Sequence, residues 1–372
     1  PRMGLAGGMI VAVFNALLTE FTTAAVYLYS FFGSVVASFS AIRLAKRSQF
    51  LSVGAAVGLA NFGVIFGTQV LSGAGAASGV ELGVYGIAGG FLLSIPLVFI
   101  VLPILENVFG LVTDITLLEL SDLNHPLLRR MVIEAPGTYH HSLVVSTLAE
   151  AACKAIGANS LLARVGAYFH DIGKLENPQF FTENQLERER DQHKTLSPET
   201  SYRIIANHVS DGIELARKYK LKDAIIDFIP QHQGTCPVYY FFKKAEESHA
   251  SKEKINIDDY RYPGPKPQLK ETAVVLLADS VEAASRSLAS VTPQSVEELV
   301  TDIINWKLID GQLDECDLTL TDVRKIQDSF THNLLAILHT RVQYPKSDVE
   351  PLWQKIVGRK TDLSRPYPHP LS

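Results

Sequence analysis

The first part of the chain is dominated by long runs of apolar and small residues. Four such runs cover residues 3–19, 23–41, 51–71 and 83–109. A helix needs roughly 20 apolar residues to cross the hydrocarbon core of a bilayer, and Gly, Ala and Ser within the runs allow close helix packing. A signal peptide is the alternative for the first and shortest run, but no small-residue cleavage site follows it. We therefore expect a transmembrane region of about four helices at 1–111.

From residue 112 onward the apolar residues recur three and four positions apart, which predicts amphipathic helices. Such helices are expected at 112–121, 141–156, 159–170, 198–219, 221–232, 269–290, 294–307 and 320–342. Ser121 or Asp122 is the expected N-cap of a further helix that has Pro126 in its first turn. The predicted fold class is therefore all-α.

Two stretches deviate from this helical pattern. Residues 236–242 (CPVYYFF) are a weak candidate for a strand, and the polar stretch 245–268 is expected to form a long loop or lid. The overall prediction is a set of polytopic transmembrane helices followed by an all-helical soluble domain. We divide the chain into a transmembrane region 1–111, a coupling segment 112–135, a soluble domain 136–345 and a loosely ordered tail 346–372.

The basic residues predict how the membrane region is oriented. Arg43, Lys46 and Arg47 lie between the second and third apolar runs, and two arginines at 129–130 follow the fourth run, whereas 72–82 contains no Lys or Arg. Basic connections face the cytoplasm by the positive-inside rule. We therefore expect the soluble domain in the cytoplasm.

The composition narrows the range of partners. The chain has 34 Lys and Arg against 39 Asp and Glu, a formal net charge of −5, so nothing favours binding to DNA or RNA polymers. The distant cysteines Cys153, Cys236 and Cys316 fit a reducing compartment better than a disulfide framework. Because the chain starts at Pro1 and enters an apolar run almost at once, we expect a truncated piece of a longer protein.

Six His and Asp residues lie within or at the ends of apolar helical runs of the soluble domain: His141, His170, Asp171, His208, His232 and Asp279. A buried imidazole or carboxylate is costly unless it is paired or metal-bound. Imidazole and carboxylate together are ligands for Zn, Mn and Fe. A single histidine of this kind is more often an ordinary core residue, but six such residues favour a two-metal site bridged by Asp171. His140 is expected to face away, because neighbours on a helix point in different directions.

The soluble domain resembles the HD-domain superfamily of metal-dependent phosphohydrolases, through the order His…His-Asp…His…His…Asp. The segments "HDIGK", "HVSDG", "HQGT", "RYPGPKPQ" and "LADSVEAA" are similar to the seven-transmembrane HD family, and the apolar runs look like its later spans. The resemblance implies a bacterial inner-membrane enzyme with a cytoplasmic HD domain that hydrolyses cyclic di-AMP to pApA. Members have seven spans and an extracellular domain, so this chain is expected to be N-terminally truncated.

The resemblance also implies a ligand set. His141, His170, Asp171 and Asp279 would surround one divalent metal, and Asp171, His208 and His232 the other. Many relatives carry a histidine where this chain has Gln233, so Gln233 is at best a weak ligand. Mn or Fe is favoured, with Zn and Ni left open. Asp171 and Lys174 are the predicted catalytic residues, although Lys174 is equally explained as a lysine at a helix C-terminus.

Further residues are candidate contacts to the substrate. With Lys174, these are Thr235, Tyr239, Lys243, Arg261 and Lys266, and packing is an equal alternative for the aromatic stretch around Tyr239. Rival functions are hydrolysis of cyclic di-GMP or ppGpp, and a cyclic-dinucleotide sensor without turnover. The missing GYP motif after His232 favours the adenine dinucleotide, and Gln233 alone favours the sensor. A homodimer is left open.

Overall fold

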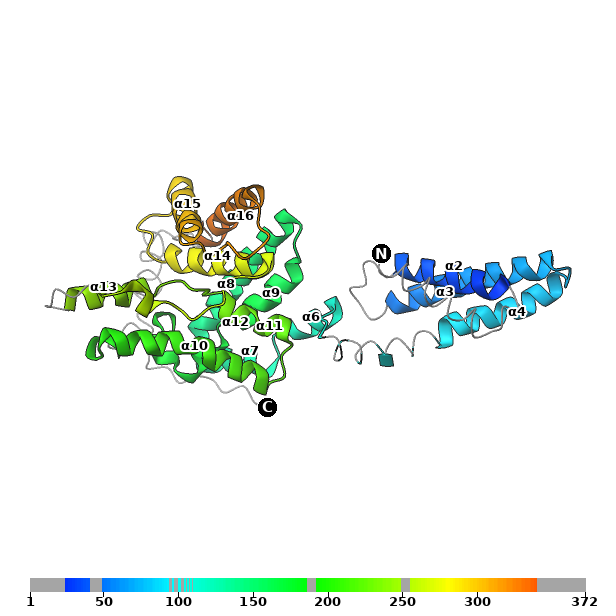
Figure 1. The fold of residues 1–372 in the computed structure, drawn as a ribbon, viewed down its shortest axis with the longest axis horizontal. Helices are drawn as coiled ribbons and strands as arrows, with labels where there is room; N and C mark the ends of the chain where they lie inside the picture. The colour runs from blue at the N-terminus through cyan, green and yellow to red at the C-terminus, as the bar shows by residue number, and fades with distance from the viewer. Residues whose placement is uncertain are drawn as a thin grey trace, which may run out of the picture.

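The computed structural model describes residues 24–40, 49–93, 110–185, 192–248 and 255–339, together with single residues between 96 and 108. Within these ranges all regular elements are helical, and the extended backbone pairs in an isolated bridge between Pro237 and Arg261. The prediction of an all-α protein is therefore confirmed for the described residues. Figure 1 shows two groups of helices, one from each part of the chain, with α6 (Asp114–Leu120) between them.

The N-terminal group consists of α2 (Ala24–Ser40), α3 (Gln49–Leu71), α4 (Ala76–Ala88) and the π-helical turn η1 (Gly89–Leu93). Helix α3 packs against both α2 and α4. Small residues permit this contact, because a Cβ added at Gly83 would lie 2.5 Å from the Phe62 ring. Among the described helices only α3, with a mean hydropathy of 1.8, is long and apolar enough to cross a membrane. The predicted number of spans is therefore not confirmed.

Some predictions for the membrane region fall outside the described residues, namely the run 3–19, the basic connection around Arg43 and the later part of the fourth run, apart from single residues. The tail 346–372 lies outside them as well. The connection 72–82 differs from expectation, because α4 already begins at Ala76. The turn is confined to residues 72–75 and contains Gly73 and Gly75, whose φ angles of 81° and 88° favour glycine.

The second group contains α7 (Pro126–Glu134), α8 (Pro136–Ile156), α9 (Ser160–Phe169), α10 (Pro198–Lys218), α11 (Asp223–Ile226), α12 (Phe228–Gln231), α13 (Tyr239–Ser248), α14 (Lys270–Ser285), α15 (Pro293–Ile309) and α16 (Leu320–His339). Short 3-10 turns lie between them: η2 (Ile172–Glu176), η3 (Pro178–Phe180), η4 (Thr182–Asn184), η5 (Gln192–Thr195) and η6 (Ile257–Tyr260). Helix α8 contacts α9, α14 and α16. Fully buried side chains such as Leu148, Leu276 and Phe330 form the core between these helices. Burying each one stabilises the folded state by about 1.5–3 kcal/mol.

Several helix boundaries differ from the predicted ones. The side chain of His125, rather than Ser121 or Asp122, caps α7 by accepting from the Leu127 N–H. The helix expected at 221–232 is divided into α11 and α12. Pro230 explains this break, because a proline lacks the N–H that would bond to the carbonyl of Ile226.

The region around 236–268 also differs from its prediction. Backbone hydrogen bonds from Val238 N to Tyr260 O and from Tyr262 N to Cys236 O hold two extended stretches together. Helix α13 then begins at Tyr239 and runs to Ser248, so neither a strand at 236–242 nor a loop from 245 describes this region correctly. Helix α14 ends at Ser285, earlier than the predicted residue 290.

Candidate metal centre

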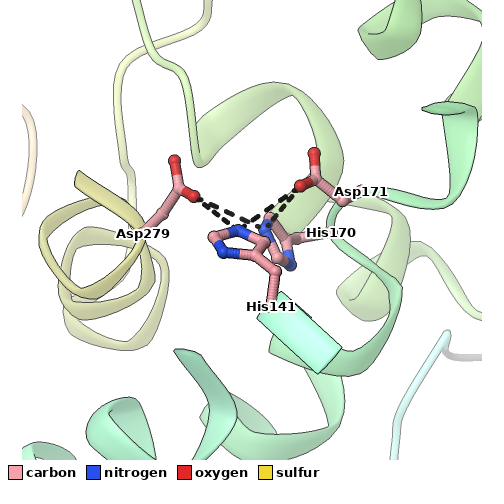
Figure 2. A group of neighbouring side chains, drawn as sticks. All are labelled: His141, His170, Asp171 and Asp279. Atoms are coloured by element: carbon pink, nitrogen blue, oxygen red, sulfur yellow. Dashed lines mark ion pairs between the residues drawn. The ribbon is translucent and has the colours of Figure 1, made fainter. Parts of the chain in front are cut away.

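The side chains predicted as metal ligands meet in one buried cluster. His141 comes from the first turns of α8 and His208 from the middle of α10. His170 and His232 stand at the C-terminal ends of α9 and α12, and Asp279 comes from α14. Figure 2 shows the carboxylates of Asp171 and Asp279 on either side of the His141 and His170 rings. These four residues form one group and Asp171, His208 and His232 form a second, with the ligand atoms of each group within 4.8 Å of one another.

Two glycines allow the elements to approach closely enough to form this cluster. A Cβ added at Gly173 would lie 1.8 Å from the carbonyl oxygen of His208, so glycine is required where η2 contacts α10. A Cβ at Gly166 would lie 2.5 Å from the Phe228 ring, where α9 contacts α12. The glycine of "HDIGK" therefore brings the backbone of His208 against the segment that carries Asp171.

Asp171 lies between the two groups of histidines and directs one oxygen to each. Its Oδ2 is 3.5 Å from His141 Nε2 and 3.3 Å from His170 Nε2. Its Oδ1 is 3.5 Å from His208 Nε2 and 3.4 Å from His232 Nε2. One carboxylate thus faces both groups, which is the geometry of a ligand that bridges two cations.

The hydrogen bonds of the histidines indicate which ring nitrogen carries the proton. Nδ1 of His170, His208 and His232 lies 2.7, 2.6 and 2.6 Å from the backbone carbonyl oxygens of Ala167, Ile205 and Ile229. A carbonyl oxygen only accepts, so each Nδ1 must donate and each neutral ring keeps its lone pair on Nε2. The Nε2 atoms of His208 and His232 then face each other at 3.4 Å as two acceptors. A cation between them would satisfy both.

Unsatisfied polar atoms point to the same conclusion. Nε2 of His170 and Oδ1 of Asp171 are buried and make no hydrogen bond, whereas Oδ2 of Asp171 has the ammonium of Lys174 2.8 Å away. Buried polar atoms are nearly always satisfied in folded proteins. Because all of these atoms are acceptors when the imidazoles are neutral, divalent cations would satisfy them together, and the residues present fit a metal site.

The charges divide the cluster into two different halves. Burial lowers the pKa of His170, but the carboxylates of Asp171 and Asp279 outweigh it and raise that pKa to about 10. Burial lowers the pKa of His208 to about 4. Burial raises the pKa of Asp171, but Lys174 and His170 hold it well below its usual value. Without metal, His170 is therefore protonated near neutral pH, whereas His208 is neutral.

Lys174 lies beside the cluster in a buried ion pair with two carboxylates. Its Nζ is 2.8 Å from Asp171 Oδ2 and 2.7 Å from Glu183 Oε1. Glu183 also accepts from the Thr138 hydroxyl, which connects η4 to α8. Lys174 lies in the last turn of the short helix η2, but its ammonium points to the cluster and not to solvent.

The other predicted substrate contacts lie in different settings. Gln233 Nε2 is 3.5 Å from Asp279 Oδ2, and Thr235 donates its backbone N–H to Gln312 Oε1. Arg261 is bound to Asp310 through Nη2 at 2.9 Å and to Asp258 through Nε at 3.0 Å. Lys266 Nζ lies 3.8 Å from Asp314.

On α13, Lys243 pairs with Glu246 and lies over the ring of the exposed Tyr239. The structure records no contact of Tyr239, Lys243, Arg261 or Lys266 with the described metal cluster.

Three residues near the cluster were not predicted from the sequence. Glu282 Oε2 is 2.5 Å from His141 Nδ1, Glu183 holds Lys174, and the buried Tyr262 ring lies 5.9 Å from the His208 ring. Glu282 stands one turn after Asp279 on α14, and residues three apart share a helix face, but this spacing alone does not indicate that it contacts His141.

Comparison with known proteins shows which family the chain is similar to. The model of the HD domain matches residues 138–284, and the model described as "7TM receptor with intracellular HD hydrolase" matches residues 1–113. The crystal structure of the Listeria monocytogenes phosphodiesterase PgpH HD domain superposes with a TM-score of 0.55 at 45% sequence identity. It covers 58% of this chain and 100% of that domain. This chain belongs to the seven-transmembrane HD family.

Curated members of the family are similar over most of this chain. The cyclic-di-AMP phosphodiesterase PgpH of Bacillus subtilis is 40% identical over 354 residues, which are 93% of this chain and 49% of that protein. Its namesake from Listeria monocytogenes is 45% identical over 69% of this chain and 35% of that protein. The chain therefore spans about half the length, or less, of these two relatives. The HD domain of the Listeria protein has also been crystallised in complex with cyclic-di-AMP, and that structure has a TM-score of 0.55 over 59% of this chain.

Proposed function

We propose that this chain is a membrane-bound, metal-dependent phosphodiesterase that hydrolyses cyclic di-AMP to pApA at a binuclear His/Asp site. The observation that carries the proposal is Asp171, which presents one oxygen to each of two histidine groups. Two relatives are named cyclic-di-AMP phosphodiesterases, and a related HD domain was crystallised with that dinucleotide. The proposed substrate is inferred from the names of these relatives, and the proposed metal-dependent hydrolysis is inferred from the His/Asp cluster.

In the proposed centre, His141, His170, Asp171 and Asp279 hold one divalent ion and Asp171, His208 and His232 hold the other, with Mn or Fe favoured over Zn or Ni. Such ions supply an acidified water as nucleophile and neutralise charge on the phosphoryl oxygens. The protein fixes their positions through four imidazoles whose Nδ1 atoms are already bound. Gln233, 3.5 Å from Asp279, is assigned to that hydrogen bond in place of metal ligation.

The hydrolysis itself is a simple exchange of bonds. The water oxygen bonds to phosphorus, the P–O3′ bond breaks, and the 3′ oxygen takes up a proton to leave linear pApA. We propose that Lys174, held between Asp171 and Glu183, donates a hydrogen bond to a non-bridging phosphate oxygen. Its ammonium keeps its charge there, since burial lowers its pKa but the two carboxylates more than compensate and raise it.

The remaining substrate contacts are proposed from their positions. Thr235 lies three residues after His232 and is held by the buried Gln312, and we propose that its hydroxyl contacts a phosphate of the substrate. Tyr239 and Lys243 form an exposed aromatic and cationic surface suited to an adenine and its phosphate. Arg261 is engaged by Asp310 and Asp258, so we assign it to holding the loop that carries Lys266.

The membrane arrangement is likewise a proposal. We infer a multi-pass region at 1–111 in the bacterial inner membrane, a coupling segment at 112–135, a cytoplasmic HD domain at 136–345 and a tail at 346–372. The contacts of the buried Glu106 with Thr113 and Thr116 support a coupling role, because they connect the last apolar run to α6. The lipid bilayer and a second copy of the chain are the proposed partners besides the dinucleotide.

A turnover assay tests the proposed function. The purified chain in detergent should convert cyclic di-AMP to pApA in the presence of Mn²⁺, and Lys174→Ala should reduce the rate by roughly 10²-fold. Parallel reactions with cyclic di-GMP and ppGpp test the rival substrates. Tight binding of cyclic di-AMP with no product would replace the enzyme by a sensor.

A further inference from the structure

The four histidines of the cluster are oriented in two different ways. Three of them donate Nδ1–H to backbone carbonyls of their own helices, three or four residues earlier. His141 instead meets a side chain from another helix, because its Nδ1 lies 2.5 Å from Oε2 of Glu282 on α14. Its orientation therefore depends on a residue that can be changed without altering the backbone.

Glu282 is itself held in place. Its side chain is buried at 6% relative exposure, and its second oxygen, Oε1, accepts from Arg286 Nη2 at 2.8 Å and Nε at 3.1 Å. The two carboxylate oxygens are thus divided, one for His141 and one for Arg286. Rotation of the carboxylate would break a charge-assisted hydrogen bond on either side.

We propose that Glu282 is a positioning residue for the four-residue group of His141, His170, Asp171 and Asp279. It keeps the proton of His141 on Nδ1, so that Nε2 presents a lone pair 2.9 Å from Asp279 Oδ1, where a metal ion would bind. Arg286 fixes Glu282 in that orientation. The inference rests on the proposed function only in that this group binds a metal. Carboxylates that orient a ligand histidine typically change metal affinity by about 10–100-fold.

The division of the two oxygens gives an unusual test. Glu282→Gln keeps the size of the side chain but leaves one carbonyl oxygen for two donors, His141 Nδ1–H and Arg286. If Arg286 takes that oxygen, the amide N–H₂ faces His141 and requires an acceptor at Nδ1, which moves the proton to Nε2 and blocks metal binding. Removing Arg286 as well frees the carbonyl oxygen for His141. A positioning role therefore predicts that the second substitution repairs the first.

The experiment measures Mn²⁺ affinity by competition with a chelating dye, using the whole chain in detergent. A His208→Ala background removes a ligand of the other group only, so a single site remains. Glu282→Gln should weaken binding by about tenfold or more, Arg286→Met alone should change it by less than about threefold, and the double variant should regain most of the loss. Glu150→Gln is the matched control, because Glu150 on α8 pairs with Arg164 away from the cluster and should not alter affinity.

Two results would overturn the inference: Mn²⁺ affinity unchanged in Glu282→Gln, or a double variant that binds as weakly as Glu282→Gln. A packing role alone would give the second result, because each substitution would then only remove contacts. The outcome is separable from the proposed function, because a chain that binds Mn²⁺ as predicted but fails to hydrolyse cyclic di-AMP would refute the activity and leave the role of Glu282 standing.

Discussion

Replacing Gly173 by alanine should damage the metal centre without touching any ligand. The added Cβ would lie 1.8 Å from the carbonyl oxygen of His208 and 2.5 Å from the backbone nitrogen of Gly212. Both obstacles are backbone atoms, so no side chain can rotate away. Ordinary contact of a Cβ begins near 3.4 Å, so η2 and α10 must separate by about 1.5 Å, and overpacking of this kind costs about 1–3 kcal/mol.

The displacement acts directly on the proposed bridge. Asp171 lies two residues before Gly173, and its Oδ1 is 3.5 Å from His208 Nε2. A shift of this size exceeds what metal–ligand distances tolerate, so the ion held by Asp171, His208 and His232 should be lost. We expect turnover of cyclic di-AMP to fall by about 10²-fold or more, since a misplacement near 1 Å is enough for that loss.

The assay combines three measurements on Gly173→Ala: the thermal midpoint, Mn²⁺ per chain and the initial rate of pApA formation. Gly63→Ala is the control, because no atom lies within 4 Å of its added Cβ in α3. Reduced metal content with a folded protein is the expected pattern. A variant that retains two ions and a rate within twofold of the unsubstituted chain would refute the close-packing argument.

Three further predictions concern the cluster itself. Asp171→Asn, which removes the shared charge but keeps the shape, should lower Mn²⁺ affinity by about 10²–10⁴-fold, corresponding to about 3–5 kcal/mol for breaking a buried ionic contact; equilibrium dialysis showing two tightly held ions would contradict it. Because the pKa of His170 without metal is raised to about 10, this residue is protonated from pH 6.5 to 8.5 and a metal must displace that proton. Burial lowers the pKa of His141 in the same group, but Asp279 and Glu282 outweigh it and raise that pKa as well. Affinity in the His208→Ala background should therefore increase by about tenfold or more per pH unit, and a flat profile would show that no proton is displaced. Gln233→His adds an imidazole beside His232 and should slow the loss of the second ion to a chelator by about tenfold; unchanged or faster loss would show that the added ring does not reach the ion.

The positions of the clustered residues were predictable from the sequence because each interrupts an apolar run. His141, His208 and Asp279 lie on helices whose other inward positions are apolar, so a polar residue there needs a partner. The structure brings them together with His170, Asp171 and His232. Their assignment as metal ligands stays a prediction, as do the predicted domain boundaries.

Residues that act through a partner were harder to predict. Glu282 resembles any glutamate on a helix until the fold places it 2.5 Å from His141 Nδ1. Arg261 looked free in a proline-rich loop, yet Asp310, 49 positions away along the chain, binds it. Long-range pairs of this kind depend on how helices pack, which periodicity alone does not specify.

The predicted boundaries of helices and strands were wrong where a tertiary contact overrides the secondary-structure preference of the local sequence. The stretch CPVYYFF has the β-branched and aromatic composition of a strand, but the backbone bridge to Arg261 ends after Pro237 and a helix follows. Burial of Phe241 and Phe242 against Tyr260 stabilises that helix. A single sequence cannot indicate that Tyr260 will be there.

Anomalous scattering from crystals of the Mn²⁺-loaded chain tests the central claim most directly. The account predicts two peaks about 3.5–4 Å apart, one on each side of Asp171, the first beside His141 and His170 and the second beside His208 and His232. A single peak on one side of Asp171, or two peaks that do not share its carboxylate, would contradict it.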